Sequence, residues 1–155
     1  MALQNLNHKH IIVTATLRSP PQTATVVESW LASLVEKVEM KILMGPYAIR
    51  CDDLGNEGVT GVVVISTSHC SAHFWDTDCE PFVKFDLYSC KDFDPLVVLD
   101  HLKVFDPVFV DAMVIDRNSL NKVSSTCTGE FNEVFEKGFT VPWTYWIGSL
   151  LGFHT

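Results

Sequence analysis

The stretch GVTGVVVISTSHCSAHFWD, residues 58–76, sets the architecture that the sequence predicts. Its first half, Val59–Ser66, is rich in β-branched residues, which favour a strand. Beyond the polar pair Thr67-Ser68, the residues His69–Trp75 alternate loosely between polar and apolar types, as a second strand would. We therefore expect two strands at the centre of the chain, with Ser68 at their junction.

Further strand and helix patterns lie on both sides of this centre. Apolar residues recur at helical spacing over residues 23–39, and Asp94-Pro95 supplies a cap and a first residue for a second helix. The other strands are expected at His10–Leu17, Met40–Ile49, Pro81–Cys90 and Phe109–Ile115. This order predicts an α+β fold, a two-layer sandwich with helices packed on one face of a mainly antiparallel sheet.

The 155 residues suit one domain, which we place at residues 1–117. Residues 118–155 begin polar and end aromatic, and we expect a C-terminal extension that packs on the domain or on a dimer partner. An anchor on a membrane surface is the alternative for this aromatic tail. Packing is favoured because Lys and Arg are absent after Lys137.

The net charge is −8, and the Lys and Arg residues form no basic run, which argues against a nucleic-acid partner. Five cysteines follow a start that lacks the pattern of a secretory leader, so reduced thiols in a cytoplasm are expected. No apolar run approaches the ~20 residues that span a bilayer, so no membrane partner is expected.

Three reactive side chains stand at or near predicted strand ends. The hydroxyl of Ser68, the imidazole of His73 and the thiol of Cys90 can converge at one rim of a sheet. Each has a simpler interpretation: Ser68 as a turn residue, and the other two as core residues. A zinc site is not expected, because the spacing of the candidate ligands is wrong and alternation points Cys70 away from its neighbours. Those candidates are His69, Cys70, His73 and Cys79.

The segments GVTGVVVISTSH, AHFW and FDLYSC resemble, in order and spacing, the bacterial-type S-adenosylmethionine decarboxylase family. The resemblance extends from His10 to about Arg117. It implies that Ser68 attacks the carbonyl of Thr67, that the chain cleaves between them, and that Ser68 becomes a pyruvoyl group. That group would serve as the cofactor of a decarboxylase in polyamine (spermidine) biosynthesis.

The same resemblance implies roles for further residues. His73 would assist self-processing as a base, Cys90 would act as a general acid, and Thr60 would hold the processing intermediate. Thr67 and His69 flank the reactive serine and would support processing. Substrate-binding positions would be Leu54, Glu57, Trp75 and Asp76. The family also implies a homodimer.

Departures from the family pattern fall on substrate recognition. Thr67 stands where relatives carry a glutamate that is implicated in binding the substrate ribose, and Leu54 stands near an aromatic that stacks on adenine. Asp76 would replace a lost family acid. Glu57 also has a simpler interpretation as part of a solvated turn. Two alternatives therefore stay open: a pyruvoyl-dependent decarboxylase of ornithine or arginine, and an unprocessed, catalytically silent homologue that binds a metabolite or a partner.

Overall fold

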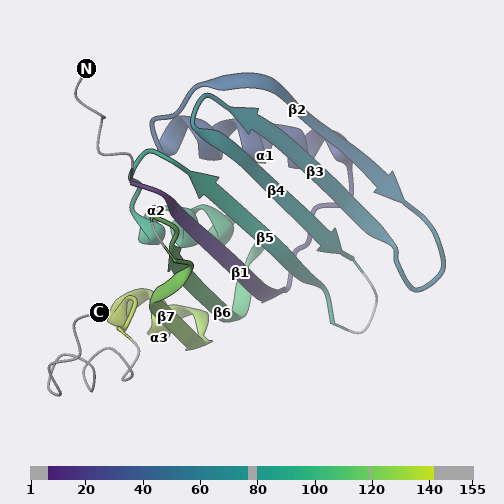
Figure 1. The fold of residues 1–155 in the computed structure, drawn as a ribbon. Helices are drawn as coiled ribbons and strands as arrows, with labels where there is room; N and C mark the ends of the chain where they lie inside the picture. Colours follow the sequence, from purple (N-terminus) through teal and green to yellow (C-terminus); the bar gives the residue numbers. More distant parts are fainter. Residues whose placement is uncertain (1–6, 77–79, 119, 142–155) are drawn as a thin grey trace, which may run out of the picture.

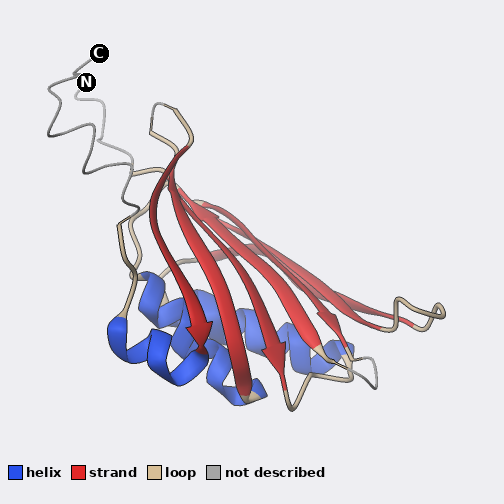
Figure 2. Ribbon diagram, turned by 90° about the horizontal axis from the view of Figure 1, so that it is seen from below, coloured by secondary structure: helices blue, strands red, loops and turns tan. Residues whose placement is uncertain are grey.

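The computed structural model describes residues 7–76, 80–118 and 120–141 of the chain. These residues form one seven-stranded sheet, and every strand pair in it is antiparallel. The helices lie on one side of the sheet, and the other face is open (Figure 2). The elements are β1 (Lys9–Leu17), α1 (Ala24–Lys37), β2 (Ile42–Cys51), β3 (Gly58–Ile65), β4 (Ser68–Trp75), β5 (Phe82–Ser89), α2 (Pro95–His101), a 3-10 helix (Leu102–Phe105), β6 (Pro107–Asp116), β7 (Lys122–Glu130) and α3 (Phe131–Lys137).

The strands lie in the order β2-β3-β4-β5-β1-β6-β7 (Figure 1). This arrangement confirms the α+β sandwich and the antiparallel sheet that the sequence predicted. The predicted strands and helices are all present, with shifts of about two residues at their ends, which is the usual disagreement in such boundaries.

The central strands pair as a hairpin. Ile65 lies opposite Ser68, so Ser66 and Thr67 form the two-residue turn between β3 and β4. Along β4, Cys70 is buried beneath the helices, whereas His69 is exposed on the opposite face. The alternation predicted for this strand is therefore confirmed, and it divides the sheet into an apolar covered face and a more polar open face.

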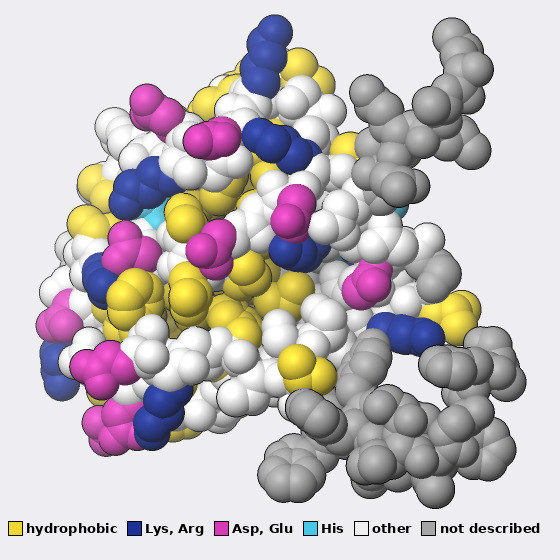
Figure 3. All heavy atoms as spheres, turned by 90° about the vertical axis from the view of Figure 1, so that its left-hand side faces the viewer, with side chains coloured by type: hydrophobic (Ala, Val, Ile, Leu, Met, Phe, Trp, Pro, Cys, Tyr) yellow, Lys and Arg dark blue, Asp and Glu magenta, His cyan; other side chains and the backbone are white. Residues whose placement is uncertain are grey.

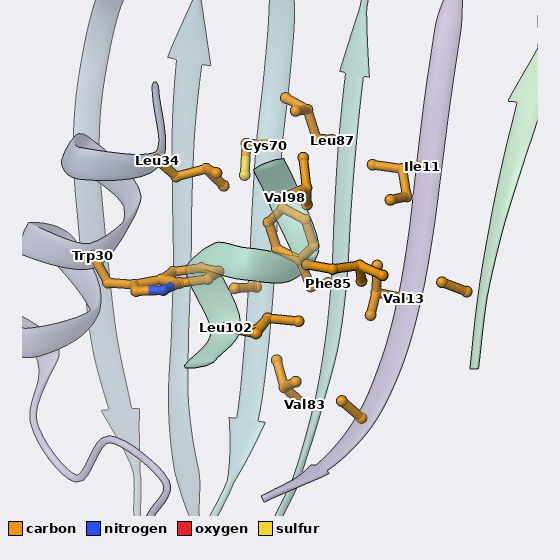
Figure 4. Packing of buried hydrophobic residues seen from close by; sticks show 14 of the residues in the cluster. Ile11, Val13, Trp30, Leu34, Cys70, Val83, Phe85, Leu87, Val98 and Leu102 are labelled. Carbon is orange, nitrogen blue, oxygen red and sulfur yellow. The ribbon is translucent and has the colours of Figure 1, made fainter. Parts of the chain in front are cut away.

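Helix α1 packs against the covered face of the sheet. Thr23 caps it by accepting a hydrogen bond from the backbone N–H of Val26. Its Trp30 packs edge-on against Phe74 and Phe85, at ring separations of 5.5 and 5.4 Å. Figure 4 shows Trp30 and Phe85 among the buried residues of the core. Gly61 of β3 lets the helix approach this closely, because a Cβ there would lie 2.6 Å from a methyl carbon of Val27.

The segment after Arg117 contains a strand that the sequence did not predict. β7 pairs with β6 and forms an edge of the sheet, and α3 follows it directly. Phe131 and Val134 of α3 are buried against the domain. The sequence of β7, KVSSTCTGE, has no apolar alternation, because its side chains contribute little to the core. The aromatic tail, with Trp143 and Trp146, lies outside the described residues.

Within the described part of the chain, none of the helices is long and apolar enough to cross a membrane. On the side of the molecule shown in Figure 3, acidic and basic side chains are interspersed and hydrophobic side chains lie between them.

Candidate active site

The turn between β3 and β4 holds the peptide bond that the family resemblance singles out. The backbone N–H of Cys90 donates a hydrogen bond of 3.0 Å to the carbonyl oxygen of Thr67. This donor lies where negative charge would develop if a nucleophile attacked that carbonyl. The Thr67 hydroxyl instead points to the sulfur of Met40, at 3.3 Å.

Ser68 lies at the start of β4 with a backbone φ of +155°. Residues other than glycine rarely adopt such a conformation, which stores strain at the residue where it occurs. Its hydroxyl oxygen lies 3.1 Å from Nδ1 of His69. The Thr67–Ser68 peptide bond therefore has three features together: a strained backbone at Ser68, the imidazole of His69 beside the hydroxyl, and a hydrogen-bond donor on the Thr67 carbonyl.

Asp86 of β5 lies beside this imidazole on the open face, and the sequence analysis did not identify it. Its Oδ2 lies 3.1 Å from Nε2 of His10 and 3.8 Å from Nε2 of His69, and Ser71 donates a hydrogen bond to Oδ1. Burial by itself would raise the pKa of Asp86. The hydrogen bonds from His10 and Ser71 and the nearby imidazoles outweigh burial and lower that pKa below its ordinary value.

Tyr88, two residues further along β5, completes this cluster. Its hydroxyl lies 2.7 Å from Nδ1 of His8, and its ring contacts the rings of His10 and His69. The guanidinium of Arg117 lies 4.2 Å from the centre of the same ring. The period-two pattern of FDLYSC places Asp86 and Tyr88 on one face, and this pattern is the signal in the sequence that points to both residues.

His73 occupies a different environment, further along β4. Its Nδ1 lies 2.5 Å from the hydroxyl oxygen of Thr60, and its ring centre is 3.8 Å from that of Trp75. Its Nε2 is buried and has no hydrogen-bond partner among the described residues. Burial lowers the pKa of His73, which favours the neutral form of the ring.

The predicted substrate-binding residues lie toward this second end of the hairpin. Asp76 is bound by Arg50 at 2.7 Å, and its side chain is only 6% exposed. Glu57 accepts a hydrogen bond from the backbone of Gly55, whereas Leu54 is 99% exposed. The Trp75 indole N–H donates to a side-chain oxygen in the β2–β3 loop and its ring stacks on β5, so this tryptophan is fixed in place.

The predicted residues thus form two groups rather than one. The first group is Thr67, Ser68, His69 and Cys90, and the second is Thr60, His73, Trp75, Asp76, Glu57 and Leu54. Five positions of β4 separate Ser68 from His73, which is about 16 Å at the usual rise of a strand. A single chain does not bring the imidazole of His73 to the serine.

The cysteines differ in reactivity. Burial raises the pKa of Cys70 well above its ordinary value and raises that of Cys127 to about 11, so both thiols are inert. Cys90 is partly exposed and adjoins the Thr67 carbonyl. Among the described residues, no three His, Cys, Asp or Glu side chains form a group that could hold a metal ion.

Fold and site together define a two-layer α+β domain with a strained serine peptide at the turn of its central hairpin. The family model described as S-adenosylmethionine decarboxylase matches residues 10–118, and the chain belongs to this family. The match covers the hairpin and the strands around it, as the resemblance in the sequence implied.

Curated relatives agree with this assignment, and a solved structure shares the fold. S-adenosylmethionine decarboxylase proenzymes of Thermotoga maritima and Bacillus velezensis are 45% identical over 47 residues and 39% identical over 46 residues. Each match covers 30% of this chain and 35% of the relative, so the aligned segment spans about a third of these curated relatives. The adenosylmethionine decarboxylase structure from Aquifex aeolicus matches with a TM-score of 0.61 at 19% identity, covering 76% of this chain and 96% of that one, and supports the fold.

Proposed function

We propose that the chain is a self-processing, pyruvoyl-dependent S-adenosylmethionine decarboxylase of polyamine biosynthesis. The observation that carries this proposal is the hydrogen bond from the Cys90 N–H to the Thr67 carbonyl, next to the strained Ser68, in a member of this family. A donor on that oxygen and a hydroxyl on the following residue are what an N-to-O acyl shift requires.

In this processing reaction the Ser68 oxygen bonds to the Thr67 carbonyl carbon, and the carbonyl π electrons move to the oxygen that Cys90 N–H holds. The C–N bond then breaks and the Ser68 nitrogen takes a proton, which leaves an ester. Loss of the Ser68 α-proton expels Thr67 as a carboxylate, and hydrolysis with release of ammonia leaves a pyruvoyl group on residue 68. The pyruvoyl group supplies an electron-withdrawing carbonyl to which the substrate amine binds during loss of CO₂.

Three residues have roles in the later steps of this proposal. His73, neutral and with a free Nε2, takes the α-proton of Ser68. Cys90, partly exposed beside residue 68, returns a proton to the substrate carbon after CO₂ leaves. Thr60 holds the His73 ring through the 2.5 Å contact at Nδ1.

A homodimer is part of the proposal, because His73 and Ser68 lie too far apart within a single chain to act together. If two copies pack through their open faces about a two-fold axis that reverses the strand direction, the His73 end of one meets the Ser68 end of the other. Apolar side chains on the open face support this packing: Ile12 is 38% exposed and Val62 is 48% exposed. We place the protein in a cytoplasm, since the four cysteines of the described part are free thiols.

The substrate is the part of the proposal with a specific competitor. Thr67 replaces a carboxylate, Asp76 is bound by Arg50, and Leu54 offers no aromatic ring, so the polar recognition of a ribose is weakened. A basic amino acid such as ornithine or arginine has the same reactive end and needs no ribose contact. It is the second candidate substrate.

Mass spectrometry of the denatured, purified protein tests the proposal. We expect two fragments that meet between Thr67 and Ser68, the longer one beginning with a pyruvoyl group. CO₂ release from S-adenosylmethionine, ornithine and arginine then identifies the substrate. A single intact chain in a preparation that decarboxylates would refute the pyruvoyl mechanism, and an intact, inactive chain would favour the silent homologue.

A further inference from the structure

We propose that His69 is the base that removes the proton from the Ser68 hydroxyl in the acyl shift, and that Asp86 positions its imidazole. This inference rests on the proposed function and adds a residue to its first step. It assigns the two histidines of β4 to different steps, His69 to ester formation and His73 to the elimination that follows.

The contacts of the His69 ring carry the inference. Nδ1 lies 3.1 Å from the Ser68 oxygen, and Nε2 on the other side of the ring lies 3.8 Å from Oδ2 of Asp86. A carboxylate favours the tautomer that carries its proton on the nitrogen nearest to it. Asp86 therefore leaves the Nδ1 lone pair free to face the Ser68 hydroxyl.

A carboxylate lies beside the position where this step places a positive charge on the His69 ring. Asp86 is held as a carboxylate by its hydrogen bonds from His10 and Ser71. The other groups of this cluster are Tyr88 from β5, whose ring meets the His69 ring, and Arg117 and His8, which both contact Tyr88. Asp86 is thus the one carboxylate within 4 Å of the His69 ring in the described part of the chain.

The proton balance of the step is complete with these groups alone. His69 Nδ1 takes the Ser68 hydroxyl proton as the Oγ–C bond to Thr67 forms, and the imidazolium lies beside the Asp86 carboxylate. When the C–N bond breaks, the same proton passes to the Ser68 nitrogen, which restores neutral His69. No other reactant is needed, and the ester has the mass of the starting chain.

His73 does not compete for this role. Its Nδ1 is engaged by Thr60, its ring lies against Trp75, and it is about 16 Å along the strand from Ser68.

Hydroxylamine separates the two steps in an experiment, because it cleaves an ester between residues 67 and 68 but leaves an amide intact.

The test compares H69Q, H73Q and H10Q chains, each sampled over time after synthesis, by mass spectrometry with and without hydroxylamine. General-base catalysis contributes about 100-fold or more, so H69Q should process at least that much more slowly and stay intact in hydroxylamine. H73Q should accumulate a chain that hydroxylamine cleaves. H10Q removes an imidazole that bonds to Asp86 but leaves the one beside Ser68, so it should slow processing less than H69Q does. D86N should slow processing and D86E should restore part of the rate.

An H69A chain provides a second test that does not depend on the size of the replacement side chain. The His69 side chain is 52% exposed in the single chain, so imidazole that is present before two chains pair can reach its place and should restore processing in proportion to its concentration. Processing of H69Q at the wild-type rate, or accumulation of the hydroxylamine-sensitive ester in H69Q, would overturn the inference while leaving the proposed function intact. A wild-type chain that never cleaves would overturn the proposed function itself, and the inference with it.

Discussion

At the scale of single residues, the Thr67 carbonyl is held by a main-chain donor, and side-chain substitutions at Cys90 leave that donor in place. The two functions proposed for Cys90 therefore reside in different atoms. In the proposed mechanism its backbone N–H serves processing, and its thiol serves the decarboxylation that follows.

Replacing Cys90 by alanine should separate these functions. C90A should still yield the two fragments that meet at Thr67/Ser68, because the N–H remains, whereas CO₂ release should fall about 100-fold or more with the loss of the general acid. Mass spectrometry and CO₂ release from the same sample measure both. S68A is the matched control, since it should lose both cleavage and activity. A C90A chain that fails to cleave but remains folded would contradict the assignment.

Thr67 offers a prediction about the substrate. Restoring the family carboxylate with T67E should lower the KM for S-adenosylmethionine about 10-fold, because charge-assisted hydrogen bonds to the ribose hydroxyls become available. T67Q, which has the same length without the charge, is the control and should give a smaller gain. If T67E leaves this KM unchanged and the wild type prefers ornithine or arginine, the basic amino acid is the substrate.

At the scale of elements, His101 joins α1 to α2. Its Nε2 donates to the backbone carbonyl of Trp30 at 2.8 Å, and the Trp30 indole N–H donates to the backbone carbonyl of His101 at 3.0 Å. Burial lowers the pKa of His101, and this outweighs the Trp30 carbonyl, which would raise it. The helix layer thus depends on an imidazole that remains neutral.

The sign of the resulting pH dependence follows from linkage. In the unfolded chain His101 has a pKa of about 6.5, and its folded pKa is lower, so below this pH the unfolded state binds more protons and the free energy of unfolding falls. H101Q should cost about 1–3 kcal/mol at about pH 7.5, because Trp30 loses its partner. The difference between H101Q and the wild type should shrink at about pH 5.5. Urea denaturation at the two pH values measures this, and a constant difference would contradict it.

Secondary structure was predictable where the sequence pattern reflects burial. In Val59–Ser66 and in the helix at 23–39, the apolar residues are those that pack between the sheet and the helices. Their spacing therefore indicates both the type of element and which of its sides is buried. β7 owes its place to backbone pairing with β6, and its polar side chains gave no such indication. Backbone pairing also brings the Cys90 N–H to the carbonyl oxygen of Thr67. A contact between backbone atoms does not depend on the residue types, so the sequence could not predict it.

At the scale of the whole molecule, the sequence identified most of the site residues but not their division between the two ends of a hairpin. Order and spacing along the chain cannot show that Ser68 and His73 lie about 16 Å apart, since only the extended conformation of β4 fixes that distance. This division is the structural reason to propose that the active site contains residues of two chains.

Mixing two defective chains tests this proposal. S68A lacks the reactive serine and H73A lacks the base, so each alone should remain unprocessed. When both are produced together, a dimer that contains one of each has one complete site, and cleaved H73A chains should appear, at up to about half of the H73A pool if subunits pair at random. Cleaved chains only in the wild-type control would show that His73 acts within its own chain or not at all.

Cleavage at Thr67/Ser68 would divide the sheet between two polypeptides that remain interleaved. The shorter piece keeps β1, β2 and β3, the longer one keeps β4 to β7, and β1 lies between β5 and β6 of the longer piece. Dissociation would break three strand-to-strand ladders at once and expose the buried side of β1, including Ile11 and Val13. Native mass spectrometry of the cleaved protein should therefore record a particle that retains both pieces of every cleaved chain, because the strand pairing holds them together without a peptide bond.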